Sequence, residues 1–332
     1  MKRITIKDIA RELNMHHSTV SRALRNDTIV KEETRKKVTE FARKYGYQVN
    51  MSALHLRGSI KNTIAVLVPN ISHNFFSNIV SVITNMAYTR GYIVSVFQSN
   101  ESARQEEEII NTLIQNNVAG VIASIAMETT NSAHFELLKK YRIPLVFFDR
   151  VCQDMNATKV TVDNYSALID VVDILVKQGC KRIAHITGDK QMNVFSERQR
   201  GYLEGLERNG IEYKRSVEIH SGFDIETGMQ ITGSLLEENP VPDALICDSH
   251  FITLGAIFKI QELNLTIPRD IAIAGFGDNP YVKVTSSQII TVVQPEAIIA
   301  EAAFDLLMKK IEKEGDDIIE TRIFSAKIVQ PV

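Results

Sequence analysis

The chain has 332 residues, of which 44% are hydrophobic, and its formal net charge at pH 7 is -2. This length exceeds that of one average domain, so we expect two or three compact units with apolar cores. No apolar run approaches the roughly 20 residues that a membrane-spanning helix needs, and the amphipathic N-terminus is unlike a secretory signal, so we expect a cytoplasmic protein. Three cysteines at unrelated spacings predict buried, unreactive thiols rather than a disulfide framework.

The charges are divided unevenly along the chain. Residues 1–60 contain 13 Lys and Arg against 6 Asp and Glu, a net charge of +7, whereas the remainder carries a net charge of -9. A basic N-terminal region favours a polyanionic partner, and the acidic remainder does not.

Residues 5–24 predict two short helices joined by a tight turn. Thr5 can cap the first helix while Asp8 returns a hydrogen bond to the backbone of Thr5, and each helix has one apolar stripe. The second helix directs small polar and basic side chains to solvent, namely Ser18, Thr19, Ser21 and Arg22. This pattern is typical of a helix that enters the DNA major groove. Residues 32–45 predict a third helix that closes a small core over the first two.

From Thr63 onward the pattern changes to apolar strands that alternate with amphipathic helices, which is typical of parallel sheets covered on both faces. The predicted strands of a first lobe are residues 64–68, 93–97, 120–125 and 145–148. After a crossover near residues 160–163, those of a second lobe are residues 182–187, 217–219, 244–247 and 271–276. We expect residues 289–294 and a terminal strand at 321–329 to return to the first lobe. Two lobes with several hinge crossings close on a ligand held between them.

Motifs along the whole chain agree in order and spacing with one known family. They are residues 5–10, 18–24 and 45–47, and then residues 66–70, 74–76, 143–150, 162–164, 198–202 and 275–276. Together they resemble the lactose-repressor and galactose-repressor (LacI/GalR) family of transcriptional regulators. The resemblance implies an all-α helix-turn-helix headpiece with a hinge helix, followed by an α/β two-lobed core of doubly wound parallel sheets, like that of periplasmic binding proteins. The implied domains are the headpiece (1–49), the hinge helix and linker (50–60) and the effector-binding and dimerisation core (61–332), with an N-lobe of about 61–160 plus 293–332 and a C-lobe of about 161–292.

The resemblance implies a homodimer that binds a near-palindromic operator, with a hinge helix from each subunit in the minor groove. Residues 50–58 are too short to be stable alone, so we expect them to order against a partner or on DNA. In the family the hinge carries the positions of Asn50, Ala53 and Leu56, and Leu56 would be a wedge in the central base step. Val49 stands where the family usually has Pro, which loses some backbone stiffness.

The base-reading positions of the family are His17, Ser18 and Arg22 here. Arg22 is the best candidate, because a guanidinium can donate two hydrogen bonds to guanine. We expect phosphate contacts from the basic side chains and from small polar residues, namely Thr5, Ser21, Asn26 and Thr34. The adjacent His16 and His17 suggest a metal site, but neighbouring helix residues do not share a face, so we expect none. His16 also replaces the family's usual Ser cap, so this helix end should be less well capped.

The resemblance also places effector-binding residues in the cleft, namely Asn70, His73, Phe75, Phe76, Asp149, Arg198, Phe223, Ser249, His250 and Asp278. Arg198 is the best single candidate, because the guanidinium fork suits hydroxyl or carboxylate oxygens. Asp149 follows an apolar strand, where ligands bind in parallel sheets. Phe75 and Phe76 can line the cleft, although two core phenylalanines are the competing interpretation.

Two departures from the family bear on the effector. Ser249-His250 stands where many members have Asn-Asp, and Gly277 precedes Asp278 where they have Asp after Gly-Phe. A histidine can hold an anion, so a sugar acid or sugar phosphate is an alternative to a neutral sugar.

These features predict a sequence-specific transcriptional regulator, most simply a repressor of carbohydrate uptake or catabolism genes whose operator affinity is changed by a sugar-like effector. The alternative within the family depends on a co-repressor or a phosphoprotein partner.

An enzyme is disfavoured because no phosphate-binding glycine loop, Gly-x-Ser-x-Gly elbow or His-Glu-x-x-His pair is present, and no cofactor is expected. A transport-type binding protein would need a signal peptide. The chain stops after its last strand without the heptad extension of the family's tetramers, so we expect a dimer.

Overall fold

The computed structural model describes residues 4–24, 26–47, 62–220, 222–277, 288–312 and 319–330. By their internal contacts, Met1–Lys61 and Asn62–Val332 form two separate compact units.

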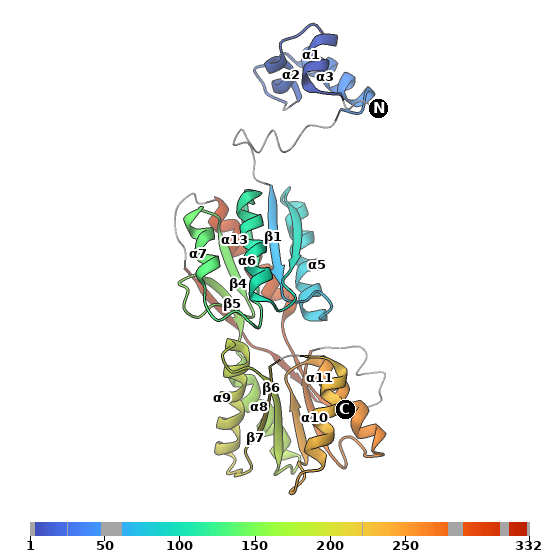
Figure 1. Ribbon diagram of the computed structural model, residues 1–332, viewed down its shortest axis with the longest axis vertical. Coiled ribbons are helices and arrows are strands. Elements are labelled where there is room, and N and C mark those ends of the chain that lie inside the picture. The colour runs from blue at the N-terminus through green and yellow to red at the C-terminus, as the bar shows by residue number, and fades with distance from the viewer. Residues whose placement is uncertain are drawn as a thin grey trace. The chain divides into compact units, whose positions relative to one another are not determined.

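The first unit is a three-helix headpiece, shown in blue in Figure 1, with α1 (Ile6–Glu12), α2 (His17–Leu24) and α3 (Glu32–Lys44). Ile9, Val20 and Val38, one from each helix, are completely buried in its core. The predicted capping box is present at the start of α1. The backbone N–H of Asp8 donates to the Thr5 hydroxyl at 3.3 Å, and the N–H of Thr5 donates to the Asp8 carboxylate at 3.0 Å. The three predicted helices are confirmed.

The first lobe of the second unit is a six-stranded sheet in the order β11-β5-β4-β3-β1-β2, and all its strand pairs are parallel. Its strands are β1 (Thr63–Val68), β2 (Ile93–Gln98), β3 (Gly120–Ala123), β4 (Leu145–Phe148), β5 (Thr158–Val162) and β11 (Thr321–Phe324). One face packs against α5 (Asn74–Thr89) and α13 (Glu296–Glu312), and the other against α6 (Ala103–Gln115) and α7 (Ala133–Lys140).

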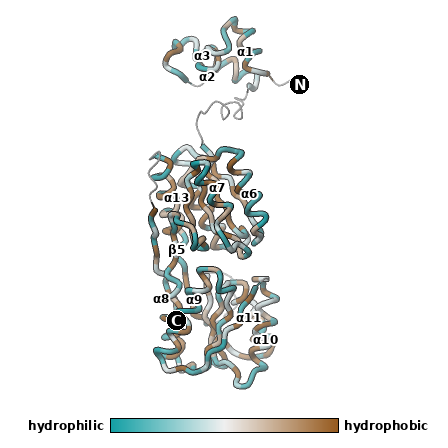
Figure 2. Tube along the Cα trace, turned by 60° about the vertical axis from the view of Figure 1, so that its left-hand side comes forward, coloured by the Kyte–Doolittle hydropathy of each residue, from teal (hydrophilic) through white to brown (hydrophobic). Residues whose placement is uncertain are grey.

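The second lobe is a six-stranded sheet in the order β12-β10-β9-β8-β6-β7. Its strands are β6 (Ile183–Gly188), β7 (Arg215–Ile219), β8 (Ala244–Cys247), β9 (Ala272–Phe276), β10 (Ile290–Val293) and β12 (Lys327–Val329), of which β12 alone is antiparallel to its neighbour. One face packs against α8 (Asn164–Lys177) and α9 (Asn193–Arg208), and the other against α10 (Ile225–Leu236) and α11 (His250–Glu262). Figure 2 shows hydrophobic segments running through the interior of both lobes, as the continuous apolar strands predicted.

The expected return of two late segments to the first lobe is wrong in part. β10 pairs with β9 and therefore belongs to the second sheet. Residues 321–329 form two strands, since β11 pairs with β5 in the first sheet and β12 with β10 in the second. The chain passes between the lobes at residues 325–326, in the middle of what reads as one strand.

In the part of the chain that the structure describes, the connections between the lobes lie at residue 163, at residues 294–295 and at residues 325–326. Segments that follow the carboxyl ends of strands, such as Asp149 after β4 and Ser249 after β8, line one cavity between the lobes. Open parallel sheets bind ligands at this edge. The three cysteines are free and buried, as predicted, and burial raises the pKa of Cys152 to about 12. No described helix has the length and apolar character to cross a membrane.

Candidate DNA interface and effector cleft

Helix α2 separates its core-facing and outward-facing side chains as predicted. Val20 and Ala23 are buried against α1 and α3, whereas His17, Ser18 and Arg22 are exposed. Thr19 and Ser21 are half-buried on the flanks. The three predicted base-reading side chains therefore lie together on the outer face of one short helix.

The N-terminus of α2 is capped by a histidine instead of a serine. The Nδ1 atom of His16 accepts a hydrogen bond from the backbone N–H of Ser18 at 3.4 Å and lies 2.8 Å from the Ser18 hydroxyl. A ring nitrogen thus takes over the usual role of a side-chain oxygen at this position. Because this bond is long, it does not contradict the expectation of a less well capped helix end.

The predicted phosphate contacts surround this helix in the headpiece. The exposed Thr5 hydroxyl donates to Asp8 at 2.6 Å, so its first role is to cap α1. Asn26 is exposed in the loop after α2, and Arg35 of α3 donates to its carbonyl oxygen at 3.3 Å. Thr34 is half-buried on α3. The predicted hinge contacts Asn50, Ala53 and Leu56 lie outside the described residues.

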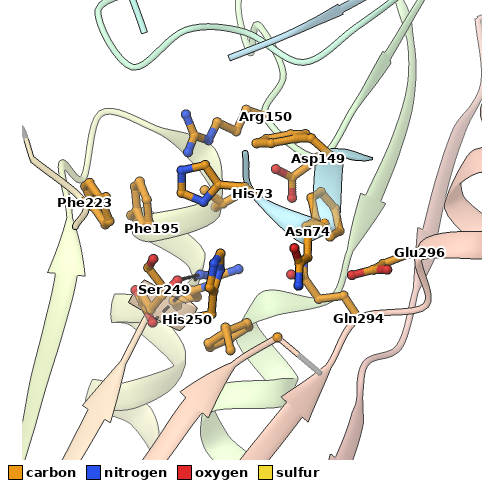
Figure 3. A pocket seen from close by; sticks show the side chains of 17 residues that line it. His73, Asn74, Asp149, Arg150, Phe195, Phe223, Ser249, His250, Gln294 and Glu296 are labelled. Atoms are coloured by element: carbon orange, nitrogen blue, oxygen red, sulfur yellow. Dashed lines mark hydrogen bonds and ion pairs between the residues drawn. The ribbon is translucent and has the colours of Figure 1, made fainter. Parts of the chain in front are cut away.

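Most of the predicted effector residues meet in the cavity between the two lobes, namely His73, Phe75, Phe76, Asp149, Arg198, Phe223, Ser249 and His250 (Figure 3). Asn70 does not line it, because its Oδ1 accepts from the backbone N–H of Ser72 in the turn before α5. Asp278 lies outside the described residues. Sequence reasoning missed other lining residues, namely Asn74, Arg150, Val194, Phe195, Asp248, Phe276, Gly277, Gln294 and Glu296. Arg150 had a signal, since it directly follows Asp149 at the strand end, whereas Phe195 on α9 belongs to no recognisable motif.

Arg198 lines the cavity, and two of its donors are already engaged. Its Nε donates to Asn164 Oδ1 and its Nη1 to the carbonyl oxygen of Asp248, both at 2.9 Å. The guanidinium also lies 3.5 Å from the centroid of the Phe276 ring. Burial lowers the pKa of Arg198, and the nearby Asp248 opposes that shift. This side chain therefore holds the cavity wall together as well as lining the cavity.

Asp248 connects the cavity to the interior of the second lobe. Its Oδ2 accepts from Thr187 at 2.6 Å, and its Oδ1 lies 3.1 Å from Nε2 of the completely buried His185. Burial alone would raise the pKa of the Asp248 carboxyl, but His185 and Arg198 hold it below its ordinary value.

Asp149 has a left-handed backbone and a buried carboxyl. Its φ of 58° lies in a region that Asp and Asn adopt more readily than most other non-glycine residues. Asn193 of the second lobe fixes this turn, because its Nδ2 donates to the Asp149 carbonyl and its Oδ1 accepts from the Val151 N–H, both at 2.9 Å. Burial raises the pKa of the Asp149 carboxyl, while Arg150 and Arg198 oppose the rise.

Arg150 is paired inside the first lobe. Its Nη1 contacts both carboxylate oxygens of Glu101, at 2.9 and 2.8 Å, and Glu101 in turn accepts from the backbone N–H of Met127. The same guanidinium lies about 6 Å from the Phe76 and Phe195 rings. Its positive charge is therefore matched before any ligand enters.

Aromatic rings form the other walls of the cavity. Phe195 and Phe223 stack with their centroids 5.5 Å apart and their planes at 17°, and Phe75 and Phe76 meet edge to face at 5.2 Å. Phe76 is buried in the core of the first lobe and also lines the cavity, so both interpretations of this side chain hold. Apolar walls with a few polar groups are usual for sites that bind small organic molecules. No cluster of His, Cys, Asp and Glu within the described residues could hold a metal ion.

Two family models match the chain. The model of the bacterial regulatory proteins of the LacI family covers residues 5–50, and that of the periplasmic binding proteins and the sugar-binding domain of the LacI family covers residues 61–330. A helix-turn-helix headpiece followed by a two-lobed binding core is the class of protein that both define. The chain belongs to the LacI family of bacterial regulatory proteins.

Similar proteins span nearly the whole chain. Catabolite control protein A of Priestia megaterium is 30% identical over 95% of this chain and 94% of its own length. The ribose operon repressor of Halalkalibacterium halodurans is 28% identical over 98% of this chain and 96% of its own. A crystal structure of the lac repressor dimer bound to operator and the anti-inducer ONPF matches with a TM-score of 0.84, at 22% identity over 99% of this chain and 98% of that chain, which supports the fold.

Proposed function

We propose that the protein is a transcriptional repressor of carbohydrate genes that binds a near-palindromic operator as a homodimer and changes its operator affinity when a small sugar-like effector occupies the cleft. The observation that carries this proposal is the presence, in one chain, of the exposed reading face of α2 and an aromatic-walled cavity between two lobes. The name of one relative, the ribose operon repressor of Halalkalibacterium halodurans, supports the carbohydrate assignment.

The proposed mechanism is a coupling of free energies between two sites. An effector that binds one arrangement of the lobes more tightly shifts the population toward it, and the dimer then presents its two headpieces differently. Coupling in such systems is typically 1–3 kcal/mol, a change of roughly 5- to 150-fold in affinity. Catalysis is not part of this function, and an operator-binding protein acts in the cytoplasm, where the DNA is.

The test is fluorescence-anisotropy titration of the full-length protein on operator-like palindromes near its own gene, with and without a panel of uncharged sugars, sugar acids and sugar phosphates. Release by one compound identifies an inducible repressor, whereas tightening identifies a co-repressed one. Specific binding that no compound alters contradicts the small-effector part and supports a protein partner. Sedimentation of a stable tetramer at micromolar concentration contradicts the dimer.

A further inference from the structure

We infer that His73 and His250 determine the specificity of the cleft: as neutral imidazoles from opposite lobes, they bind hydroxyl groups of an uncharged effector and disfavour sugar acids and sugar phosphates. This inference rests on the proposed effector role of the cleft.

The two imidazoles, one from each lobe, meet edge to face in the wall of the cavity. His73 precedes α5 in the first lobe and His250 begins α11 in the second, with ring centroids 5.4 Å apart and planes at 84°. In Figure 3, His73 lies between Arg150 and His250. Neither ring makes a hydrogen bond to any residue that the structure describes, and both are half-buried and line the cavity.

Hydroxyl groups suit such a pair. A neutral imidazole offers one N–H donor and one nitrogen acceptor, and a hydroxyl can both donate and accept. Next to His250, the buried Oγ of Ser249 has no hydrogen-bond partner and lines the same cavity. A buried hydroxyl without a partner is uncommon in folded proteins, so Ser249, beside two histidine rings that line the same cavity, points to a ligand that supplies the missing bond.

The charges around the pair do not favour an anion. Arg150 and Glu101 both face His73, and they neutralise each other through two short contacts. Arg198 is matched by Asp248, and the remaining ionisable groups at the cavity among the described residues, Asp149 and Glu296, are carboxyls. An anionic effector would have to displace a carboxylate from its arginine or protonate the histidines.

Protonation of the pair is itself unfavourable. Burial lowers the pKa of both histidines, to about 4 for His250, and Arg150 lowers the pKa of His73 further while Glu101 opposes it. Two imidazolium rings at this separation would repel each other and Arg150. The pair is therefore neutral at pH 7.

This state gives the pH dependence of binding a definite sign. An uncharged effector that needs the nitrogen acceptors binds the unprotonated pair, so its affinity falls as the pH drops through the histidine pKa values. An anion stabilises the imidazolium form, so its affinity rises as the pH drops. The direction of the change separates the two classes of ligand.

The test is isothermal titration calorimetry of the full-length protein between pH 8 and pH 4. The probes are D-ribose, D-xylulose, D-glucose and D-fructose as uncharged sugars, D-glucuronate as a sugar acid and fructose 1-phosphate as a sugar phosphate. We expect an uncharged sugar to bind tightest. Its affinity should not change with pH above pH 7 and should fall by up to about tenfold per pH unit at low pH. Binding that is tightest for an anion, or that strengthens as the pH falls, overturns the inference.

Variants separate hydrogen bonding from a merely structural role. H73Q and H250N keep a donor and an acceptor, so we expect them to bind the sugar within a few-fold of the parent while losing the pH dependence. H73A and H250A should each lose about two- to tenfold in affinity. H220Q changes a largely exposed histidine beside Asp189, outside the cavity, and should change neither property.

Two results test the inference separately from the proposed function. Titration of histidine-labelled protein by NMR, with H73Q and H250N for assignment, should show a pKa below the ordinary 6.5 for both rings, and an ordinary pKa for either overturns the inference. Failure of every probe to bind also overturns the inference. Operator binding measured by anisotropy tests independently whether the protein is a DNA-binding regulator.

Discussion

The headpiece and the cleft present their functional side chains in opposite ways. On α2, the predicted readers His17, Ser18 and Arg22 are exposed, and the core beneath them is formed by other residues. In the cleft, Arg198 and Asp149 are buried and bonded to partners from distant parts of the chain. A surface reader can change without harm to the fold, whereas a cleft residue supports the fold and the ligand together. Each prediction below tests that contrast.

The largest effect is expected from Arg198→Ala. It removes the cation beside the buried Asp248 and leaves Asn164 Oδ1 and the Asp248 carbonyl without their donor, so we expect a loss of roughly 3 kcal/mol in the free energy of unfolding of the core. Urea denaturation followed by circular dichroism measures it. Arg200→Ala is the matched control on the same helix. Arg200 is exposed, pairs with Glu197 at the surface and lies over the Tyr165 ring, so this substitution should cost less than about 1 kcal/mol. Equal effects of the two substitutions would remove the basis for treating Arg198 as structural.

Arg22→Ala should act on DNA alone. Loss of a guanidinium that reads guanine costs about 1–3 kcal/mol of discrimination between the operator and a sequence changed at that base. Arg43→Ala, an exposed arginine at the end of α3, should instead weaken binding to all sequences equally and reduce its salt dependence. Anisotropy with matched duplexes gives both values, and effector affinity should stay constant. A fall in effector affinity for Arg22→Ala would contradict the separation of the two regions.

The contrast between the headpiece and the cleft also explains which parts of the fold and of the site could be predicted from the sequence. The helices of the headpiece and the strands β4 and β8 could be predicted because apolar spacing and caps are local signals. The sheet membership of β10 and β12 could not be predicted, because β10 pairs with β9 and β12 pairs with β10, and no local pattern in the sequence specifies these pairings. In the same way, the resemblance indicated Arg198, but nothing local indicates that Glu101, 49 residues away, pairs with Arg150.

A smaller effect is expected from Thr5→Ala. It removes the side-chain acceptor of the capping box, so we expect the headpiece to lose about 1 kcal/mol while the core is unchanged. Amide hydrogen exchange of α1 measures this stability separately from the core. Thr28→Ala, at an exposed turn position, is the control and should be neutral. Faster exchange in the core as well would show that the two units do not unfold independently.

The smallest effect is the pH dependence of core stability. Burial lowers the pKa of His250 to about 4, so between that value and its ordinary pKa of 6.5 the unfolded chain binds a proton that the folded chain does not. The stabilisation that the neutral His250 provides is therefore retained above its ordinary pKa of 6.5 and is lost progressively as the pH falls below that value. At pH 6 we expect a loss of about 0.5 kcal/mol in the free energy of unfolding, allowing for solvent in the cleft. The difference in unfolding free energy between the parent and His250→Asn should change by this amount from pH 7.5 to pH 6. A His250→Asn difference that does not change with pH would contradict the burial of this ring in the cleft.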